Sequence, residues 1–268
     1  MEENLDKIHS VLFGILKEIA TLCEKHNIGY FLDSGTLLGA VRHKDFIPWD
    51  DDADITMKRE DYEKFRNAAK ELPAPYLLVE PQDYNGYFFD FIPRVIHTKE
   101  PLREEKEEDR AQNNYQNRVS VDIFLIDSAP DKKLSFRTKV LRQKILYGEA
   151  MAHRFDKRKH AYSLSEKIRI SVLGFFGKFH SLDHILKKQK RLSTSHNKSK
   201  TNYYYISNTL IGELNKRYPK EAFDSFVRLP LRNTYFNCPG GYDCVLTTLY
   251  GDYMTPPPPA ERHPTHSD

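Results

Sequence analysis

The sequence has few cysteines, a single tryptophan and no long apolar run. Three cysteines occur in 268 residues, and the charged opening segment MEENLDKIHSVLFGIL lacks the apolar core of a signal peptide. These features argue against a disulfide-stabilised secreted domain and predict a reduced, cytoplasmic protein. The longest apolar stretch, near residues 170–176, is far shorter than the ~20 residues that a membrane-spanning helix needs.

The sequence also lacks a strong excess of charge of either sign. Lys and Arg number 41 against 38 Asp and Glu, which leaves a net charge of +3. This small basic excess does not indicate nucleic-acid binding. The spacing of Cys238 and Cys244 matches no common zinc motif, so ordinary thiols are expected there. Hydrophobic residues make up 39% of the chain, enough for the core of one large domain or a core with an elaboration.

The spacing of apolar residues and the positions of turn residues predict an alternation of helices and strands in the first 130 residues. Apolar residues recur at helical spacing over 3–26, and Ser34 to Thr36 form a turn that leads into a short helix ending at Arg42. Strands are expected over 30–32, 52–57, 76–79, 87–97 and 118–126, and one more helix is expected over 59–72. The polar run over 101–117 predicts a solvated or mobile loop.

From Asp131 onward the patterns predict a mainly helical region. Ser163 and Glu166 fit a capping box, and Ser181 fits the N-cap of the following helix. The segment KIRISVLGFFGKF, residues 167–179, favours a buried core helix, with contact to a membrane surface as the alternative. The proline-rich tail after Tyr250 is expected to be extended over the surface.

Four aspartates occupy the five positions from 50 to 54. Carboxylates crowded in this way repel one another, and a chain accommodates them most readily around a multivalent cation. Oxygen ligands without neighbouring His or Cys favour Mg²⁺ or Mn²⁺ over zinc. The cluster therefore predicts a metal site.

Strand parity divides this cluster into two parts. Because alternate side chains of a strand share a face, Asp52 and Asp54 point to one side while Asp50 and Asp51 belong to the preceding loop. Asp122, the one acid inside the apolar strand RVSVDIF, is the best candidate for a third carboxylate. Asp127 is a weaker alternative, because it is expected in the turn after that strand.

The turn formed by Ser34, Gly35 and Thr36 precedes a short helix. Free backbone N–H groups and the positive end of the helix dipole at such a turn suit a phosphate. Ordinary helix capping is the alternative explanation for a turn of this sequence. Because an Asp-x-Asp strand follows shortly after, the turn and the carboxylates are expected to face the same substrate.

The segment SGTLLGAVRHKDFIPWDDDAD resembles the signature of the LicD family, which includes the fukutin-related proteins. The resemblance extends to VSVDIF and to YGDYMTPPPPAERH, so it spans nearly the whole chain. It implies an α+β fold with a nucleotidyltransferase-like mixed sheet core and flanking helices. On this basis residues 1–128 form the catalytic core, and residues 129–268 form a mainly helical region packed on it, on the acceptor side.

The same resemblance implies a metal-dependent phosphotransferase that uses a CDP-activated alcohol. Phosphocholine from CDP-choline is the commonest donor group in such bacterial proteins, and ethanolamine, glycerol or ribitol phosphate are the alternatives. The acceptor would be a hydroxyl of a cell-surface or lipid-linked glycan such as teichoic acid, with release of CMP. Mg²⁺ or Mn²⁺ would be the cofactor. The expected location is the cytoplasm, in possible contact with the inner face of the membrane, and no nucleic acid is involved.

By similarity, individual residues receive roles. Asp52 and Asp54 match the metal-binding pair, and Asp122 would complete the metal site or accept the proton of the attacking hydroxyl. The remaining candidates are substrate contacts: Ser34, Gly35 and Thr36 for phosphate, Arg42 for phosphate or as a solvated surface residue, Trp49 for a quaternary ammonium cage, and Arg262 and His263 from the C-terminal block.

The sequence leaves two other functions open. The run DADIT also fits the motif of haloacid-dehalogenase-like phosphatases, whose first aspartate ends a hydrophobic strand, whereas here a loop precedes Asp52. A nucleotide-binding protein without turnover is the non-enzymatic alternative, but it would gain little from three mutually repelling acids.

Overall fold

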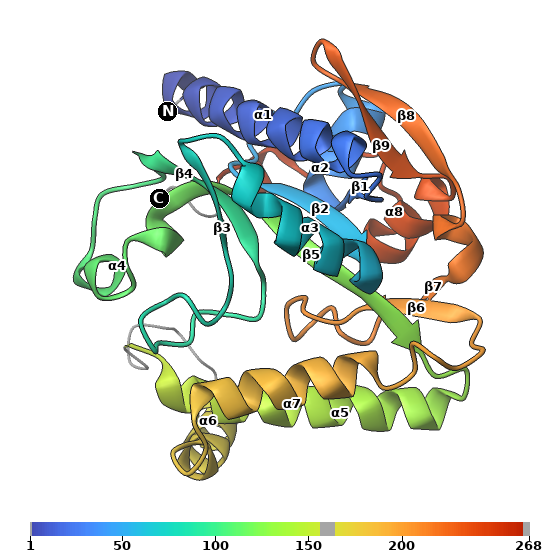
Figure 1. The fold of residues 1–268 in the computed structure, drawn as a ribbon. Coiled ribbons are helices and arrows are strands. Elements are labelled where there is room, and N and C mark those ends of the chain that lie inside the picture. Colours follow the sequence, from blue (N-terminus) through green and yellow to red (C-terminus); the bar gives the residue numbers. More distant parts are fainter. Residues whose placement is uncertain (1, 156–163, 265–268) are drawn as a thin grey trace.

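The computed structural model describes residues 2–155 and 164–264 (Figure 1). The helices are α1 (Glu2–Lys25), α2 (Ser34–Arg42), α3 (Arg59–Ala68), α4 (Glu107–Ala111), α5 (Lys133–Ala150), α6 (Leu164–Gly177), α7 (Leu182–Thr194) and α8 (Tyr242–Tyr250). The strands are β1 (Phe31–Leu32), β2 (Ala53–Lys58), β3 (Tyr76–Val79), β4 (Arg94–Pro101), β5 (Arg118–Ala129), β6 (Tyr203–Ile206), β7 (Tyr218–Pro219), β8 (Phe226–Leu231) and β9 (Thr234–Pro239). The expected α+β class is confirmed.

A mixed sheet forms the centre of the molecule. Its strand order is β1-β2-β5-β4-β3, and β2 runs parallel to β5 while the other pairs are antiparallel. The C-terminal half of β5 also pairs with β6, which pairs with β7. The second half of the chain therefore contributes strands to the same sheet. A separate hairpin, β8-β9, lies beside β1.

Helices cover the sheet in layers (Figure 1). α1 and α3 pack on one face, where Ile55 of β2 and Ile123 of β5 are fully buried in the main core. Because side chains alternate along a strand, Asp54 and Asp122 point to the opposite face. α5, α6 and α7 lie together along the lower edge of Figure 1, away from α1.

The prediction of a mainly helical second half is wrong. Strands β6 to β9 occupy much of residues 203–239, between α7 and α8. Their sequences are short, and only β6, with three successive tyrosines, is rich in a residue that favours strands. Each strand pairs with a partner distant in sequence or with a hairpin neighbour, so the helical pattern of α5 to α7 does not continue.

Three local predictions also need correction. The strand expected over 87–97 begins only at Arg94, because Pro93 has no N–H to donate and Asp90 Oδ1 accepts from Ile92 N. The run over 101–117 is not simply a solvated loop, since α4 carries Asp109, whose carboxylate is buried against Arg103.

The third correction concerns Asp127. It lies within β5 rather than in a turn, and Arg59 donates two hydrogen bonds to its carboxylate, at 3.1 and 2.5 Å. The pKa of Asp127 is lowered because these bonds outweigh the effect of burial. Asp127 is therefore committed to an ion pair that joins α3 to the sheet.

Several features match their prediction. The N-cap at Ser181 is confirmed, with its hydroxyl accepting from His184 N at 3.2 Å, while Ser163 of the proposed capping box lies outside the described residues. All three cysteines are free thiols. Within the two described ranges, no helix has both the length and the apolar character needed to cross a membrane.

Candidate active site

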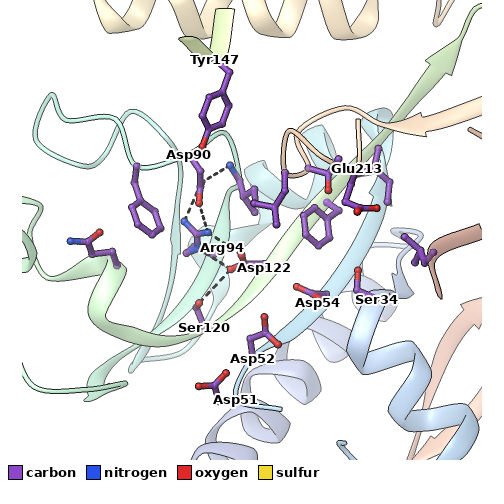
Figure 2. A pocket seen from close by; sticks show the side chains of 18 of the residues that line it. Ser34, Asp51, Asp52, Asp54, Asp90, Arg94, Ser120, Asp122, Tyr147 and Glu213 are labelled. Carbon is purple, nitrogen blue, oxygen red and sulfur yellow. Dashed lines mark hydrogen bonds and ion pairs between the residues drawn. The ribbon is translucent and has the colours of Figure 1, made fainter. Parts of the chain in front are cut away.

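A cavity of about 600 Å³ opens on the face of the sheet opposite α1 (Figure 2). Helices, strands and loops from both halves of the chain contribute to its lining, which includes Ser34, Asp51, Asp52, Asp54, Asp90, Arg94, Ser120, Asp122, Tyr147, Glu213, Lys216 and Tyr250. The structure thus brings the three predicted carboxylates, from β2 and β5 and the residue before β2, to one cavity.

Asp54 and Asp122 are direct neighbours across the parallel pair β2-β5. Asp54 is 8% exposed, and its pKa is raised well above the usual range, first by burial and then by the charges of Asp52 and Asp122. Within the described part of the chain, the Asp54 carboxylate accepts no hydrogen bond. The side chain is therefore held in a costly environment with its oxygens directed at the cavity (Figure 2).

Asp122 is bound by an arginine that no sequence motif marks. Arg94 of β4 donates to both carboxylate oxygens, from Nε to Oδ1 at 2.8 Å and from Nη2 to Oδ2 at 2.9 Å. Arg94 also pairs with Asp90 at 2.8 Å and donates to the Tyr84 hydroxyl at 2.9 Å. Burial raises the pKa of Asp122, and Arg94 opposes that effect. The Ser120 hydroxyl also donates to Oδ1 at 3.4 Å, whereas among the described residues Oδ2 has only the bond from Arg94 and retains a lone pair for a further partner.

The turn before α2 differs from the expectation in one respect. Asp33 is the N-cap, with Oδ1 accepting from Ser34 N at 2.8 Å, and burial raises the pKa of Asp33 to about 6. The Thr36 hydroxyl accepts from Asp54 N at 2.8 Å and is buried, so it lines neither cavity of the site. Thr36 positions the start of β2, and Ser34 and Gly35 remain at the surface of the site.

A smaller cavity of about 230 Å³ adjoins the first. The two share Ser34, Asp52, Asp54 and Tyr250, and the smaller one adds Gly35, Trp49 and Asp50. A Cβ at Gly35 would collide with the Asp50 carboxylate, so only glycine permits this close approach. Asp52 and Asp54 therefore stand between two spaces that could hold two parts of one substrate.

Arg42, Arg262 and His263 do not line either cavity. Arg42 donates to Tyr253 O at 2.9 Å, and the Arg262 guanidinium lies over the Trp49 ring, 5.2 Å from its centroid. His263 Nδ1 is 3.1 Å from the carbonyl oxygen of Pro264. The three residues thus lie in or against the C-terminal tail, and Trp49 contacts both that tail and the smaller cavity.

Sequence patterns missed several residues of the site. Asp90 and Arg94 lie in a segment of aromatic residues. Two charged residues in such a segment are the sequence signal that could have indicated them. Tyr250 heads the C-terminal block; burial and the charges of Asp54 and Asp33 raise the pKa of its hydroxyl. Glu213 and Lys216 come from the loop before β7, for which the sequence offered no motif.

The donor groups suit a hard cation. Among the described residues, no group of three His, Cys, Asp or Glu side chains converges closely enough to enclose a metal ion. Asp52 and Asp54 nevertheless present oxygen-only ligands, and the raised pKa of Asp54 shows that positive charge there would be stabilising. The residues present fit Mg²⁺ or Mn²⁺ held by this pair.

The site thus combines a mixed sheet, carboxylates on the adjacent parallel strands β2 and β5, and the start of the short helix α2. The family model for the LicD/FKTN/FKRP nucleotidyltransferase domain matches residues 27–159, which contain α2, β2, β5 and all three carboxylates. The chain belongs to this family.

Known relatives extend this similarity along the chain. The lipopolysaccharide cholinephosphotransferase LicD of Haemophilus influenzae is 28% identical over 270 aligned residues, which cover 96% of this chain and 93% of that protein. Uncharacterised proteins of Rickettsia prowazekii and Rickettsia typhi are each 52% identical over 50 residues, 19% of this chain and 19% and 16% of theirs.

Proposed function

We propose that this protein transfers phosphocholine from CDP-choline to a hydroxyl of a cell-surface glycan precursor, such as teichoic acid, and releases CMP. The observation that carries the proposal is the lining of the main cavity by Asp52, Asp54 and Asp122, with Ser34 at the start of α2 beside them. Family membership and the cholinephosphotransferase relative support the donor class.

The reaction needs charge neutralisation, positioning and one proton acceptor. The acceptor oxygen attacks the phosphorus that carries choline, the bond from that phosphorus to the oxygen of CMP breaks, and the hydroxyl proton passes to a carboxylate. Mg²⁺ held by Asp52 and Asp54 would supply the positive charge that the diphosphate requires.

Asp122 is the proposed proton acceptor. Its burial raises its pKa, and the two hydrogen bonds from Arg94 hold the carboxylate in one orientation. A carboxylate of raised basicity is a better general base than an exposed one. Arg94 is a positioning residue in this scheme, because it acts on the reaction through Asp122.

The phosphatase alternative has less support from the geometry. Its nucleophile would stand at the end of a hydrophobic strand, whereas Asp52 precedes β2 and Asp54 is the second residue of that strand. Release of inorganic phosphate from a simple phosphomonoester, without any CDP compound, would support that alternative instead.

The decisive experiment measures CMP release from CDP-choline, CDP-ethanolamine, CDP-glycerol and CDP-ribitol, with Mg²⁺ and after its removal with EDTA. We expect release from CDP-choline that requires the divalent ion. If another of these donors is cleaved instead, the proposed transferase activity holds, but the transferred alcohol is not choline. If none of the four is cleaved, the transferase proposal fails.

Asp54→Asn separates function from folding. We expect CMP release to fall on the order of a thousandfold, because the variant loses a charged ligand at the reaction centre. The folded-state pKa of Asp54 is raised, so its ionisation destabilises the fold at neutral pH, and the variant should melt at a higher temperature. Exposed Asp224→Asn is the control, with neither effect. Full activity in Asp54→Asn would contradict the assignment.

A further inference from the structure

The outer face of α5 and the end of α6 expose an unusual amount of apolar surface. Thirteen large hydrophobic side chains are exposed in the described part of the chain, and seven of them lie here. They are Leu134, Leu141 and Ile145 of α5, Val172, Phe175 and Phe176 of α6, and Phe179 just after it, with exposed fractions from 37% to 76%. We call these seven residues the α5–α6 face. The favoured prediction that residues 167–179 form a buried core helix is therefore wrong for the second half of that segment.

Helical geometry places the two parts of this face on the same side of the molecule. Leu134, Leu141 and Ile145 are spaced by seven and four residues, so they form one stripe along α5. Gly148 continues that stripe three residues further on. A Cβ at Gly148 would collide with Leu173, so α6 packs closely against the end of the same stripe.

The aromatic part of the face is not covered by the residues that the structure describes. Phe175 and Phe179 are 58% and 73% exposed, and their ring centroids lie 5.4 Å apart. The ring centroids of Phe175 and Phe176 lie 5.7 Å apart. Three phenylalanine rings that contact one another while facing solvent cost free energy unless another apolar phase covers them.

Basic side chains surround the apolar stripe. α5 contains five basic residues against one acid, and of the basic five only Lys139 is buried. Arg137 and Arg142 are exposed on the two flanks of the stripe, and Lys178 is exposed between Phe176 and Phe179. Lysine is depleted in the centres of protein–protein interfaces, whereas basic flanks around Phe and Leu are typical of segments that lie on anionic membranes.

We propose that the α5–α6 face docks on the surface of an anionic lipid membrane, with its phenylalanine rings in the headgroup region and its basic residues at the lipid phosphates. The C-terminal end of α5 also reaches the candidate active site. Tyr147, two residues after Ile145 and so on the other side of the helix, points into the main cavity (Figure 2). The C-terminal end of α5 would thus lie between the docked surface and the cavity. This inference does not depend on the proposed reaction.

The test measures co-sedimentation of the purified chain with vesicles of phosphatidylcholine, with and without phosphatidylglycerol. We expect binding only to the anionic vesicles, weakened by high salt. The double variant Phe175→Ser with Phe179→Ser should lower the partition coefficient by about tenfold or more. Arg137→Gln and Arg142→Gln should each lower it roughly fivefold.

Matched controls keep the result specific. Phe226→Ser removes a phenylalanine that is 60% exposed on β8, and Lys64→Gln removes an exposed charge on α3; both should bind like the wild type. Circular dichroism checks the fold, and Leu141→Gln provides a second apolar variant.

Two outcomes overturn the proposal. One is unchanged vesicle binding in the Phe175 and Phe179 double variant. The other is absence of wild-type binding to anionic vesicles; if the wild type also elutes as a dimer that this variant dissociates, the face is a contact between two copies of the chain.

Discussion

At the scale of single residues, the site depends on one buried arginine shared by two carboxylates. Arg94 is 5% exposed and pairs with both Asp90 and Asp122. Burial alone would lower the pKa of Arg94, but the two acids raise it, so the guanidinium stays charged inside the protein. The orientation of Asp122 is therefore set by strand β4, which comes from a different part of the sequence.

Removing this arginine should destabilise the fold strongly. Arg94→Met removes a buried guanidinium from two acids that are 16% and 22% exposed, so we expect a loss of roughly 3–5 kcal/mol in the free energy of unfolding. The control is Arg66→Met, because Arg66 also pairs with an acid, Glu80, but its side chain is 44% exposed. That variant should cost less than about 1 kcal/mol. Urea denaturation measures both, and equal losses would contradict the role of Arg94.

A second residue-scale prediction concerns the pH dependence of stability. Asp33 has a folded-state pKa of about 6 against an ordinary value of 3.8, so the folded state favours its protonated form. The contribution of Asp33 to the free energy of unfolding is fully present below pH 3.8 and is lost as the pH rises from 3.8 to about 6. The loss amounts to about 3 kcal/mol, at 1.36 kcal/mol for each pKa unit.

Asp33→Asn tests this linkage without removing the helix cap. Asparagine caps helices as well as aspartate does, but it does not ionise. We expect the stability of the variant to decline less than that of the wild type over this pH interval, as measured by urea denaturation at several pH values. Parallel curves for the two proteins would show that Asp33 titrates normally.

At the scale of elements, the close approach of the loop before β2 to the start of α2 shapes the smaller cavity. Gly35→Ala should displace Asp50 and its neighbours, because the added methyl group occupies the position of that carboxylate. We expect CMP release to fall on the order of a hundredfold, the effect of misplacing reacting groups by about 1 Å. Gly212→Ala, where an added Cβ meets nothing within 4 Å, should be fully active. Equal activity of both variants would show that this approach does not matter.

Local patterns were sufficient for most elements of the first half. α1, α2, β2 and β5 follow from apolar periodicity and turn residues, and their positions agree with the predicted ranges within one to three residues. Strands β6 to β9 were missed because short strands acquire their hydrogen bonds from distant partners, which no local pattern specifies. β6, for example, exists as the antiparallel neighbour of β5.

At the scale of the whole molecule, the C-terminal tail contacts the N-terminal part of the chain at α2 and at the loop before β2. Arg42 donates to Tyr253 O at 2.9 Å, and Arg262 covers Trp49. We expect Arg42→Ala to speed tryptic cleavage after Arg262 roughly fivefold, the effect of losing about one hydrogen bond. The control Arg228→Ala removes a comparable bond to Tyr235 O at 2.9 Å within the β8-β9 hairpin. Mass spectrometry of the released fragment measures the rates, and identical rates in both variants would contradict this role.

The predicted carboxylates Asp52, Asp54 and Asp122 could be identified from the sequence because strand parity and a charge inside an apolar strand are local signals. The partners of these carboxylates could not. Arg94 binds Asp122 only because β4 lies beside β5, and Thr36 contacts Asp54 N only because α2 packs against β2. Likewise, a helical pattern cannot tell which apolar residues of α5 and α6 will be covered. Burial and ion pairing depend on which segments become neighbours, and that is decided by the packing of the complete chain.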